Sequence, residues 1–208
     1  MSKYDKVMEG VKECTKYPKI IHGVSGMLSR PEAEWLHRIP RVVGDGWYVD
    51  LGTFRGRSAC LMADTIRSEN LAAQIFTVDT FDDRGISRRF RSDGSIETSS
   101  GDGKDHSIGV IQTFKDKGLD GYIDVIKSTT VEAVGFFEGD GVDFLFIDAD
   151  HIYEGVSDDF WAWQGKVVEG GFIAFHDSHR GGVTKLHDYL TTWEEFDRVD
   201  TLSVWRRK

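Results

Sequence analysis

Five short apolar runs recur along the chain, and most are followed by a segment with the spacing of an amphipathic helix. The runs are residues 47–51, 74–79, 122–126, 142–147 and 172–175. The helical segments are residues 57–66, 108–117, 153–166 and 183–190. Strands buried on both faces read as near-continuous apolar runs, and their alternation with helices is typical of a parallel sheet covered on both sides. The pattern predicts an α/β, doubly wound, Rossmann-like fold.

The two ends of the chain complete this picture. Residues 1–40 have the character of two short amphipathic helices, with Ser29 as a cap and Pro31 in a first turn. Residues 196–205 alternate loosely and predict a C-terminal antiparallel strand pair, which gives a mostly parallel sheet of seven strands. Right-handed crossovers then send strands one to three to one side and strands four and five to the other. A crevice should open above the carboxyl ends of strands one and four.

Residues 82–107 interrupt the alternation. They are rich in Gly, Ser, Arg and Asp and poor in apolar residues. Such a long segment in a compact domain is usually a functional lid or disordered. We expect a lid-like or disordered loop here, within a single domain that spans residues 1–208.

Composition narrows the class of partner. The chain has 208 residues, of which 26 are basic and 35 acidic, for a formal net charge of −9. A net negative surface argues against nucleic acid or an anionic membrane as the main partner. The two cysteines do not form a disulfide framework, no secretory signal pattern opens the chain, and no run of about eighteen apolar residues would span a membrane. We expect a cytoplasmic protein with a small-molecule partner, and a homo-oligomer is left open.

The segment VDLGTFRGRS forms the first strand-to-helix turn. Gly52 and Gly56 allow a sharp turn, and the free amides of the next helix, with the Ser58 hydroxyl, offer an anion site. The middle glycine of the dinucleotide fingerprint is missing, as is the GK[ST] ending of a P-loop, which disfavours NAD, FAD and ATP. Asp79 ends the next strand, where an acid can accept ribose hydroxyls. Together these features favour a nucleoside ligand that carries an anion but no pyrophosphate; glycines alone would indicate only a tight turn.

Four segments in this order carry a resemblance: VDLGTFRGRS, TVDTF, FLFIDADHIYE and EGGFIAFHDS. They resemble the class I S-adenosylmethionine-dependent methyltransferases, in particular the small-molecule O-methyltransferases of the catechol, macrocin and cephalosporin-hydroxylase-like group. The resemblance covers about residues 45–180. It implies methyl transfer from S-adenosylmethionine to a hydroxyl of a small molecule, in some members with the help of a divalent metal.

The resemblance also implies roles for individual residues. The cofactor would be bound by Asp50, Gly52, Thr53 and Gly56 at its methionine part, Ser58 at its carboxylate, Asp79 at the ribose, Ser128 and Thr129 at the adenine, and Asp148 near the sulfonium. In metal-dependent members, the positions of Asp148, His176 and Asp177 bind Mg²⁺. A histidine suits this hard cation poorly, and Asp177 with Ser178 is an alternative register.

The resemblance gives Asp148 and His151 as the candidate catalytic residues: His151 lies three residues after Asp148, where catechol-type members place a lysine base. Histidine titrates near neutral pH and could take the acceptor's proton, with Asp150 or Glu154 to orient it. Alternatively, His151 is a structural residue at the start of the next helix. Two rival functions also stay open: a nucleotide-cofactor oxidoreductase on the same scaffold, and a cofactor-binding module without catalysis.

Overall fold

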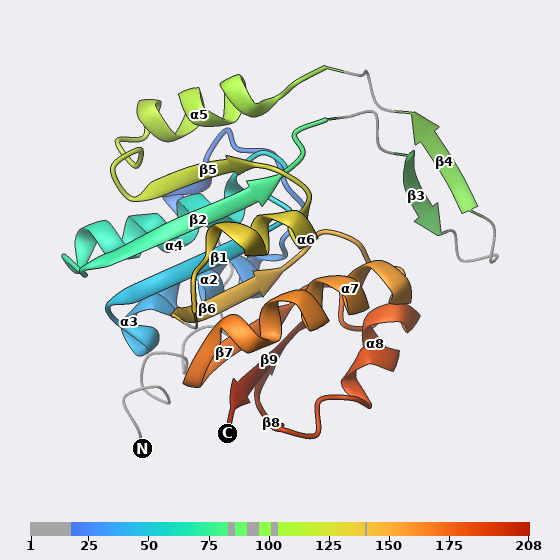
Figure 1. Cartoon of the computed structure of the whole chain (residues 1–208). Helices are drawn as coiled ribbons and strands as arrows, with labels where there is room; N and C mark the ends of the chain where they lie inside the picture. The colour runs from blue at the N-terminus through green and yellow to red at the C-terminus, as the bar shows by residue number, and fades with distance from the viewer. Residues whose placement is uncertain (1–17, 83–85, 91–95, 101–103, 140) are drawn as a thin grey trace.

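A seven-stranded sheet forms the centre of the molecule. The computed structural model describes residues 18–82, 86–90, 96–100, 104–139 and 141–208. The order of the strands is β5-β2-β1-β6-β7-β9-β8 (Figure 1). Their bounds are β1 Gly46–Leu51, β2 Ala73–Asp79, β5 Ile123–Lys127, β6 Val142–Ile147, β7 Val167–Phe175, β8 Trp193–Val199 and β9 Leu202–Arg207. The first five strands are parallel and the last two antiparallel, so the predicted fold class is confirmed.

The strand order also confirms the predicted reversal of winding between the first and fourth strands of the sequence pattern, now β1 and β6. β1 lies between β2 and β6, and the chain leaves β1 toward β2 but leaves β6 toward β7. Leu51 at the end of β1 pairs with Ile147 at the end of β6 and with Val78 on β2. Three carboxyl ends are therefore level with one another at the point where the direction of winding reverses.

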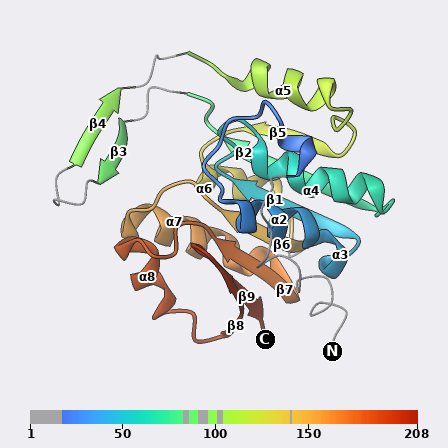
Figure 2. The same ribbon diagram turned by 180° about the vertical axis from the view of Figure 1, so that it is seen from behind.

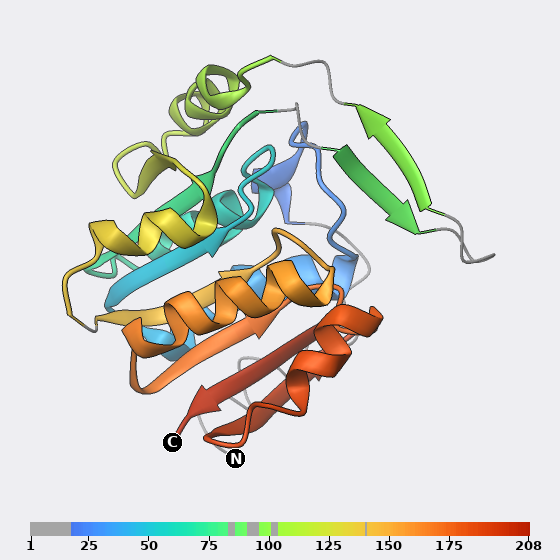
Figure 3. The same ribbon diagram turned by 45° about the vertical axis from the view of Figure 1, so that its right-hand side comes forward.

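Helices cover both faces of the sheet (Figures 2 and 3). One face is covered by η1 Lys19–Ile21, α2 Arg30–Arg38, α3 Pro40–Val43, α4 Arg57–Ser68 and α5 Ser107–Asp116. The other is covered by α6 Thr130–Ala133, α7 Tyr153–Trp163 and α8 Gly181–His187, with the 3₁₀ turns η2 Val134–Phe136 and η3 Gln164–Lys166. Alternate strand residues face opposite sides: Tyr48 packs with the α4 layer and Val49 with the α7 layer. Asp50 therefore shares the α4 side with Tyr48.

Helix α2 begins where the sequence predicts. Ser29 is its N-cap in a capping box: the Ser29 hydroxyl accepts from the Glu32 amide at 3.4 Å, and the Glu32 carboxylate accepts from the Ser29 amide at 2.8 Å. Pro31 occupies the first turn. Of the two helices expected in residues 1–40, this one is confirmed, and residues 1–17 lie outside the described part.

The segment 82–107 differs from its prediction. In place of a loop it contains β3 Ile86–Phe90 and β4 Ile96–Ser100, which pair antiparallel in a separate two-stranded sheet (Figures 1 and 3). Strands that pair only with each other need no buried apolar run, which is why the hydrophobic pattern gave no sign of them. The lid role stays a prediction. Across the described residues, no helix has the length and apolar character needed to cross a membrane.

The cap of α2 gives a first testable prediction. Replacing Ser29→Ala removes the side-chain acceptor of the Glu32 amide and should lower the free energy of unfolding by about 1 kcal/mol. Ser29→Thr keeps a hydroxyl and should cost less. Urea unfolding of the three chains measures the difference, and equal losses for both variants would contradict the capping role.

Candidate functional site

The turn after β1 is packed directly against the chain that leaves β6. Gly52 has φ of +93°, and a Cβ there would lie 2.3 Å from the backbone oxygen of Asp148. The Asp148 amide donates to the Leu51 carbonyl at 2.9 Å, and the Gly52 amide donates to the Val78 carbonyl at 2.9 Å. No side chain fits at residue 52, so glycine is required for this contact between neighbouring strand ends.

A buried carboxylate supports the turn from below. Asp50 is fully buried and accepts from the Ser58 hydroxyl at 2.9 and 3.0 Å and from the Thr77 hydroxyl at 2.9 Å. The Thr53 and Thr77 hydroxyl oxygens lie 2.5 Å apart. Burial raises the pKa of Asp50 to about 7, although the two hydroxyl donors oppose the shift. This network joins β1, β2 and the start of α4 into one unit.

This hydrogen-bond network occupies three side chains that were expected to contact the cofactor. The side chains of Asp50, Thr53 and Ser58 are turned inward, with at most 6% of each residue exposed. The Ser58 hydroxyl, expected to meet a cofactor carboxylate, donates to Asp50 because a buried carboxylate needs donors. Gly52 stays partly accessible, whereas Gly56, with φ of +81°, is packed against Phe114 of α5.

Asp79 points toward the same turn. One carboxylate oxygen accepts from the Phe54 amide at 2.8 Å, and the other accepts from the Phe81 amide at 2.8 Å. The side chain of Phe54 is about half exposed, and its backbone has a left-handed φ of +48°. Sequence reasoning missed Phe54, whose amide holds the acid at the mouth of the sheet. Asp79 is therefore oriented and still partly accessible.

The residues after β5 lie at the same edge. The Ser128 amide donates to the Asp79 carbonyl at 3.1 Å, which brings the end of β5 beside the end of β2. Thr129 is exposed and caps α6 by accepting from the Glu132 amide at 3.2 Å. Of the two, Ser128 is half-buried.

Asp148, His176 and Glu32 form a chain of three ionisable groups beside the ends of β6 and β7. His176 Nδ1 lies 2.9 Å from Asp148 Oδ1, and His176 Nε2 lies 3.2 Å from Glu32 Oε2. The second Glu32 oxygen accepts from the Thr201 amide at 2.9 Å and from its hydroxyl at 2.6 Å. Glu32 and His176 are buried, while a quarter of the Asp148 side chain is exposed. Glu32 was not singled out from the sequence.

The partners in this chain change one another's pKa. Burial by itself would lower the pKa of His176, but hydrogen bonds to Asp148 and Glu32 outweigh it and raise the pKa to about 10. Burial would raise the pKa of Glu32, but the His176 and Thr201 hydrogen bonds lower it to about 2. At neutral pH the pair is therefore an imidazolium and a carboxylate.

His151 also has a carboxylate partner, though not a predicted one. Its Nε2 lies 3.3 Å from Asp177 Oδ2 and 4.0 Å from Asp148 Oδ1. The expected orienting acids do other work: Asp150 accepts from the Ile152 amide at 2.9 Å, and Glu154 is exposed in the first turn of α7. Burial lowers the pKa of His151, partly opposed by the charges of Asp148 and Asp177.

The predicted metal ligands do not fit a metal site. Both ring nitrogens of His176 face carboxylates, which leaves no lone pair for an ion. The Asp177 carboxylate instead faces His151 and Arg180, whose Nε lies 2.8 Å away. Across the part of the chain that the structure describes, no group of three or more His, Cys, Asp or Glu is arranged to hold a metal ion. The expectation of Mg²⁺ is not supported.

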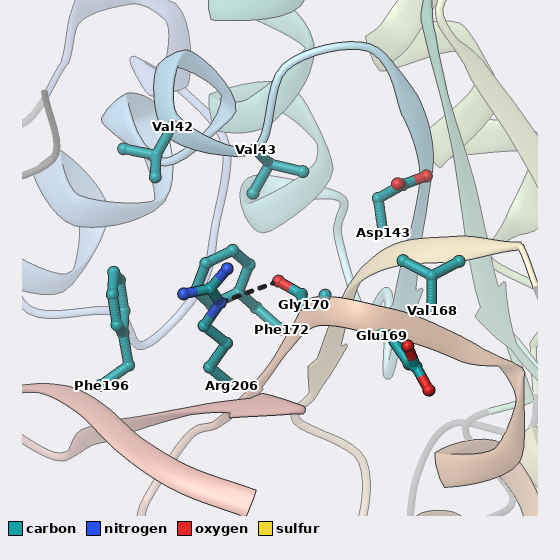
Figure 4. Close-up of a pocket in the computed structure, with 10 residues that line it drawn as sticks. Val42, Val43, Asp143, Val168, Glu169, Gly170, Phe172, Phe196 and Arg206 are labelled. Atoms are coloured by element: carbon teal, nitrogen blue, oxygen red, sulfur yellow. Dashed lines mark hydrogen bonds between the residues drawn. The ribbon is translucent and has the colours of Figure 1, made fainter. Parts of the chain in front are cut away.

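A separate pocket lies at the opposite end of the sheet (Figure 4). It measures about 480 Å³ and is lined by apolar Val42, Val43, Phe172 and Phe196. Arg206 reaches into it and donates to the Gly170 carbonyl at 3.2 Å. The pocket lies beside the amino ends of β6 and β7, away from the carboxyl ends of β1 and β6.

Comparison with known proteins bears on this geometry. Residues 49–178 match the family model described as "Methyltransferase domain". Uncharacterized protein R132 of Acanthamoeba polyphaga mimivirus is 27% identical over 130 residues, which is 62% of this chain. The matched region spans 50% of that relative's length.

Solved structures of similar fold include three methyltransferases. The O-methyltransferase NovP has a TM-score of 0.66 at 17% identity, covering 97% of this chain and 88% of its own. The Podospora anserina methyltransferase PaMTH1, bound to S-adenosylhomocysteine, has a TM-score of 0.64 at 16% identity, with coverages of 98% and 86%. TomG of Streptomyces achromogenes, in complex with S-adenosylmethionine, has a TM-score of 0.61 at 13% identity, with coverages of 100% and 92%. At these identities the likeness establishes the fold.

The raised pKa of Asp50 predicts a specific dependence of stability on pH. The unfolded chain loses this proton near pH 3.8, whereas the folded chain keeps it to about pH 7. The folded state binds more protons between these values, so the contribution of Asp50 to stability falls as the pH rises through this window. In Asp50→Asn this decline should be absent, a difference of a few kcal/mol (order of magnitude). Urea unfolding at several pH values measures it. The exposed control Asp120→Asn should follow the parent, and a parallel pH dependence for Asp50→Asn would contradict the assignment.

Proposed function

The chain belongs to the Methyltransferase domain family, and from this premise we propose that it transfers a methyl group from S-adenosylmethionine to a hydroxyl of a small molecule. The observation that carries the proposal is the Asp79 carboxylate, held beside the Gly52 turn at the point where the sheet reverses its winding. PaMTH1 and TomG, which share the fold, hold the product and the cofactor of such a reaction.

Asp79 has the capacity to bind both hydroxyls of a ribose. Each of its oxygens accepts one backbone amide, and an ionised carboxylate offers about four lone-pair sites in all. One acceptor position per oxygen is therefore left for a ligand hydroxyl. Ser128 and Thr129 would lie toward the adenine, and the accessible backbone at Gly52 toward the methionine part. Asp50, Thr53 and Ser58 would act from beneath, by fixing the shape of the turn.

The reaction itself is a displacement at carbon. S-adenosylmethionine supplies a methyl group on a sulfonium: the acceptor O–CH₃ bond forms, the S–CH₃ bond breaks, and the electron pair stays on sulfur. The protein has to align the acceptor oxygen and take its proton. In typical cases positioning contributes ~7–11 kcal/mol, and a placed base ~10²–10⁴-fold in rate.

His151 is the base we propose, and its geometry selects one atom. Nε2 faces Asp177, so the neutral ring that donates there carries its hydrogen on Nε2. Nδ1 is then the nitrogen with a free lone pair and takes the acceptor's proton. Asp177 fixes the tautomer and the ring orientation, as a carboxylate does for a catalytic histidine elsewhere. Burial, which lowers the pKa of His151, keeps the ring neutral and ready to accept.

A small-molecule acceptor is supported by charge and by the neighbours. The formal charge of −9 disfavours a polyanionic acceptor. NovP and TomG are O-methyltransferases by description. The rival oxidoreductase gains no observation in its favour, since the glycine turn keeps only two glycines and the Asp50 network fills the space beneath it.

The cofactor site makes one prediction. Calorimetry should detect binding of S-adenosylhomocysteine to the parent chain, and Asp79→Ala should weaken it by about 100-fold or more, because two charge-assisted hydrogen bonds are lost. Asp124→Ala removes an exposed acid from neighbouring β5 and should bind like the parent. The absence of heat with the parent chain, or heat with NADH instead, would sink the proposal.

The base makes a second prediction. His151→Gln should lower kcat by ~10²–10⁴-fold and leave the affinity for S-adenosylhomocysteine unchanged. Asp177→Asn should give a smaller loss, because the ring stays but its anchor weakens. Turnover is followed as S-adenosylhomocysteine released over a panel of phenols, catechols and sugars. His22→Gln, at an exposed histidine that directly follows η1, is the matched control, and a loss equal to that of His151→Gln would contradict the assignment.

A further inference from the structure

We propose that His176, clamped between Glu32 and Asp148, is a built-in cation that takes the place of a divalent metal at this site. The proposal rests on the proposed methyl transfer, and it assigns a positioning role to two residues that need not touch substrate. It starts from the finding that Asp148, His176 and Asp177 follow β6 and β7, where metal-dependent relatives would place their ligands. All three already interact with other side chains of the protein.

The hydrogen bonds leave little freedom in the protonation of His176. A neutral imidazole has one N–H and one lone pair, yet both ring nitrogens face carboxylate oxygens, at 2.9 and 3.2 Å. A lone pair directed at either oxygen would be repelled. Only the doubly protonated ring donates to both partners, and an imidazolium has no lone pair to offer a metal ion.

Glu32 is held in its acceptor form by its other contacts. Its oxygens receive the Ser29 amide at 2.8 Å and the Thr201 amide at 2.9 Å, in addition to the Thr201 hydroxyl. These donors come from the cap of α2 and from the β8–β9 turn, so two distant parts of the chain fix one carboxylate. With 1% of Glu32 exposed, an opposite charge is needed beside it, and His176 provides that charge.

The remaining groups around the cluster are also neutralised. Asp177 lies against His151 and Arg180, and the ring of Phe146 packs near His176 at 6.4 Å between centroids. A divalent ion would have to displace the His176 proton and then separate Asp148 from its partner. Asp148 Oδ1, both ring nitrogens of His176 and Asp177 Oδ2 are therefore already paired with groups of the protein itself.

The consequence for the site concerns Asp148. His176 fixes Asp148 Oδ1, while a quarter of the Asp148 side chain stays exposed. Glu32 in turn fixes His176, so helix α2 determines the orientation of the acid near the transferred methyl group. Metal-dependent relatives would use an ion for this; here a side chain and a capping box do it.

Metal addition and chelation on the parent chain test whether the site works without a divalent metal. Turnover should be unchanged by EDTA and by added Mg²⁺, and calorimetry with Mg²⁺ and electron paramagnetic resonance with Mn²⁺ should show no stoichiometric site. Turnover that is lost with EDTA and restored by Mg²⁺, or one Mn²⁺ bound per chain and lost in His176→Asn, would overturn it.

Nitrogen-15 NMR of the histidine rings tests whether His176 is positively charged. At about pH 8 both ring nitrogens of His176 should carry protons, whereas an ordinary histidine is neutral there. Glu32→Gln should let His176 lose its proton at lower pH and should reduce kcat by about tenfold or more through misplacement of Asp148. The affinity for S-adenosylhomocysteine should change little. Glu138→Gln is the exposed control.

The outcomes separate the two proposals. A neutral His176 in the parent chain at about pH 8 would refute the built-in cation whatever the variants do, including variants that fail to fold. A charged His176 without any binding of S-adenosylhomocysteine would instead refute the proposed function.

Discussion

The strands β1 and β6 end at the same height in the sheet, and this alignment sets the positions of the site residues. Leu51 and Ile147 pair across the ladder, and Gly52 then passes so close to the Asp148 carbonyl that no side chain fits. The crossovers leave these two strands in opposite directions, which is the point in an open α/β sheet where ligands usually bind. Asp79 is the last residue of β2, and Asp148 and His151 follow β6, so all three lie at the end of the sheet where these strands stop.

Two buried carboxylates at this end of the sheet are stabilised by different means. Asp50 receives hydroxyl donors alone, and its pKa is raised to about 7 because burial outweighs them. Glu32 receives an imidazolium as well as neutral donors, and its pKa falls to about 2. The contrast shows that a neighbouring cation lowers the pKa of a buried carboxylate far more than neutral hydrogen-bond donors do. Asp50 therefore works as a hydrogen-bonding brace under the glycine turn, while Glu32 works as a fixed charge that holds His176.

The sequence predicted well what depends on local pattern. The strand ends, the reversal of winding and the position of Asp79 at the end of β2 follow from apolar runs and from the rule that parallel strands end at one edge. Contacts between distant segments could not be predicted: Glu32 and His176 are 144 residues apart, and Asp177 reaches His151 from another strand end. Ser58 is a second example. A hydroxyl at the start of a helix can bind a ligand or a buried acid, and in this fold it donates to Asp50. The β3–β4 pair was not predicted because its strands contain no apolar run.

A cation that is part of the chain has an electrostatic consequence for the proposed reaction. The cofactor arrives with a positive sulfonium and the product leaves without it. With His176 as the partner of Asp148 the pair is close to neutral, and together with Glu32 the cluster carries one net negative charge. A divalent ion in the same place would add positive charge next to the sulfonium and disfavour the cofactor relative to the product. The net negative charge of Glu32, His176 and Asp148 therefore attracts the positively charged cofactor more strongly than the product, which has lost the sulfonium charge.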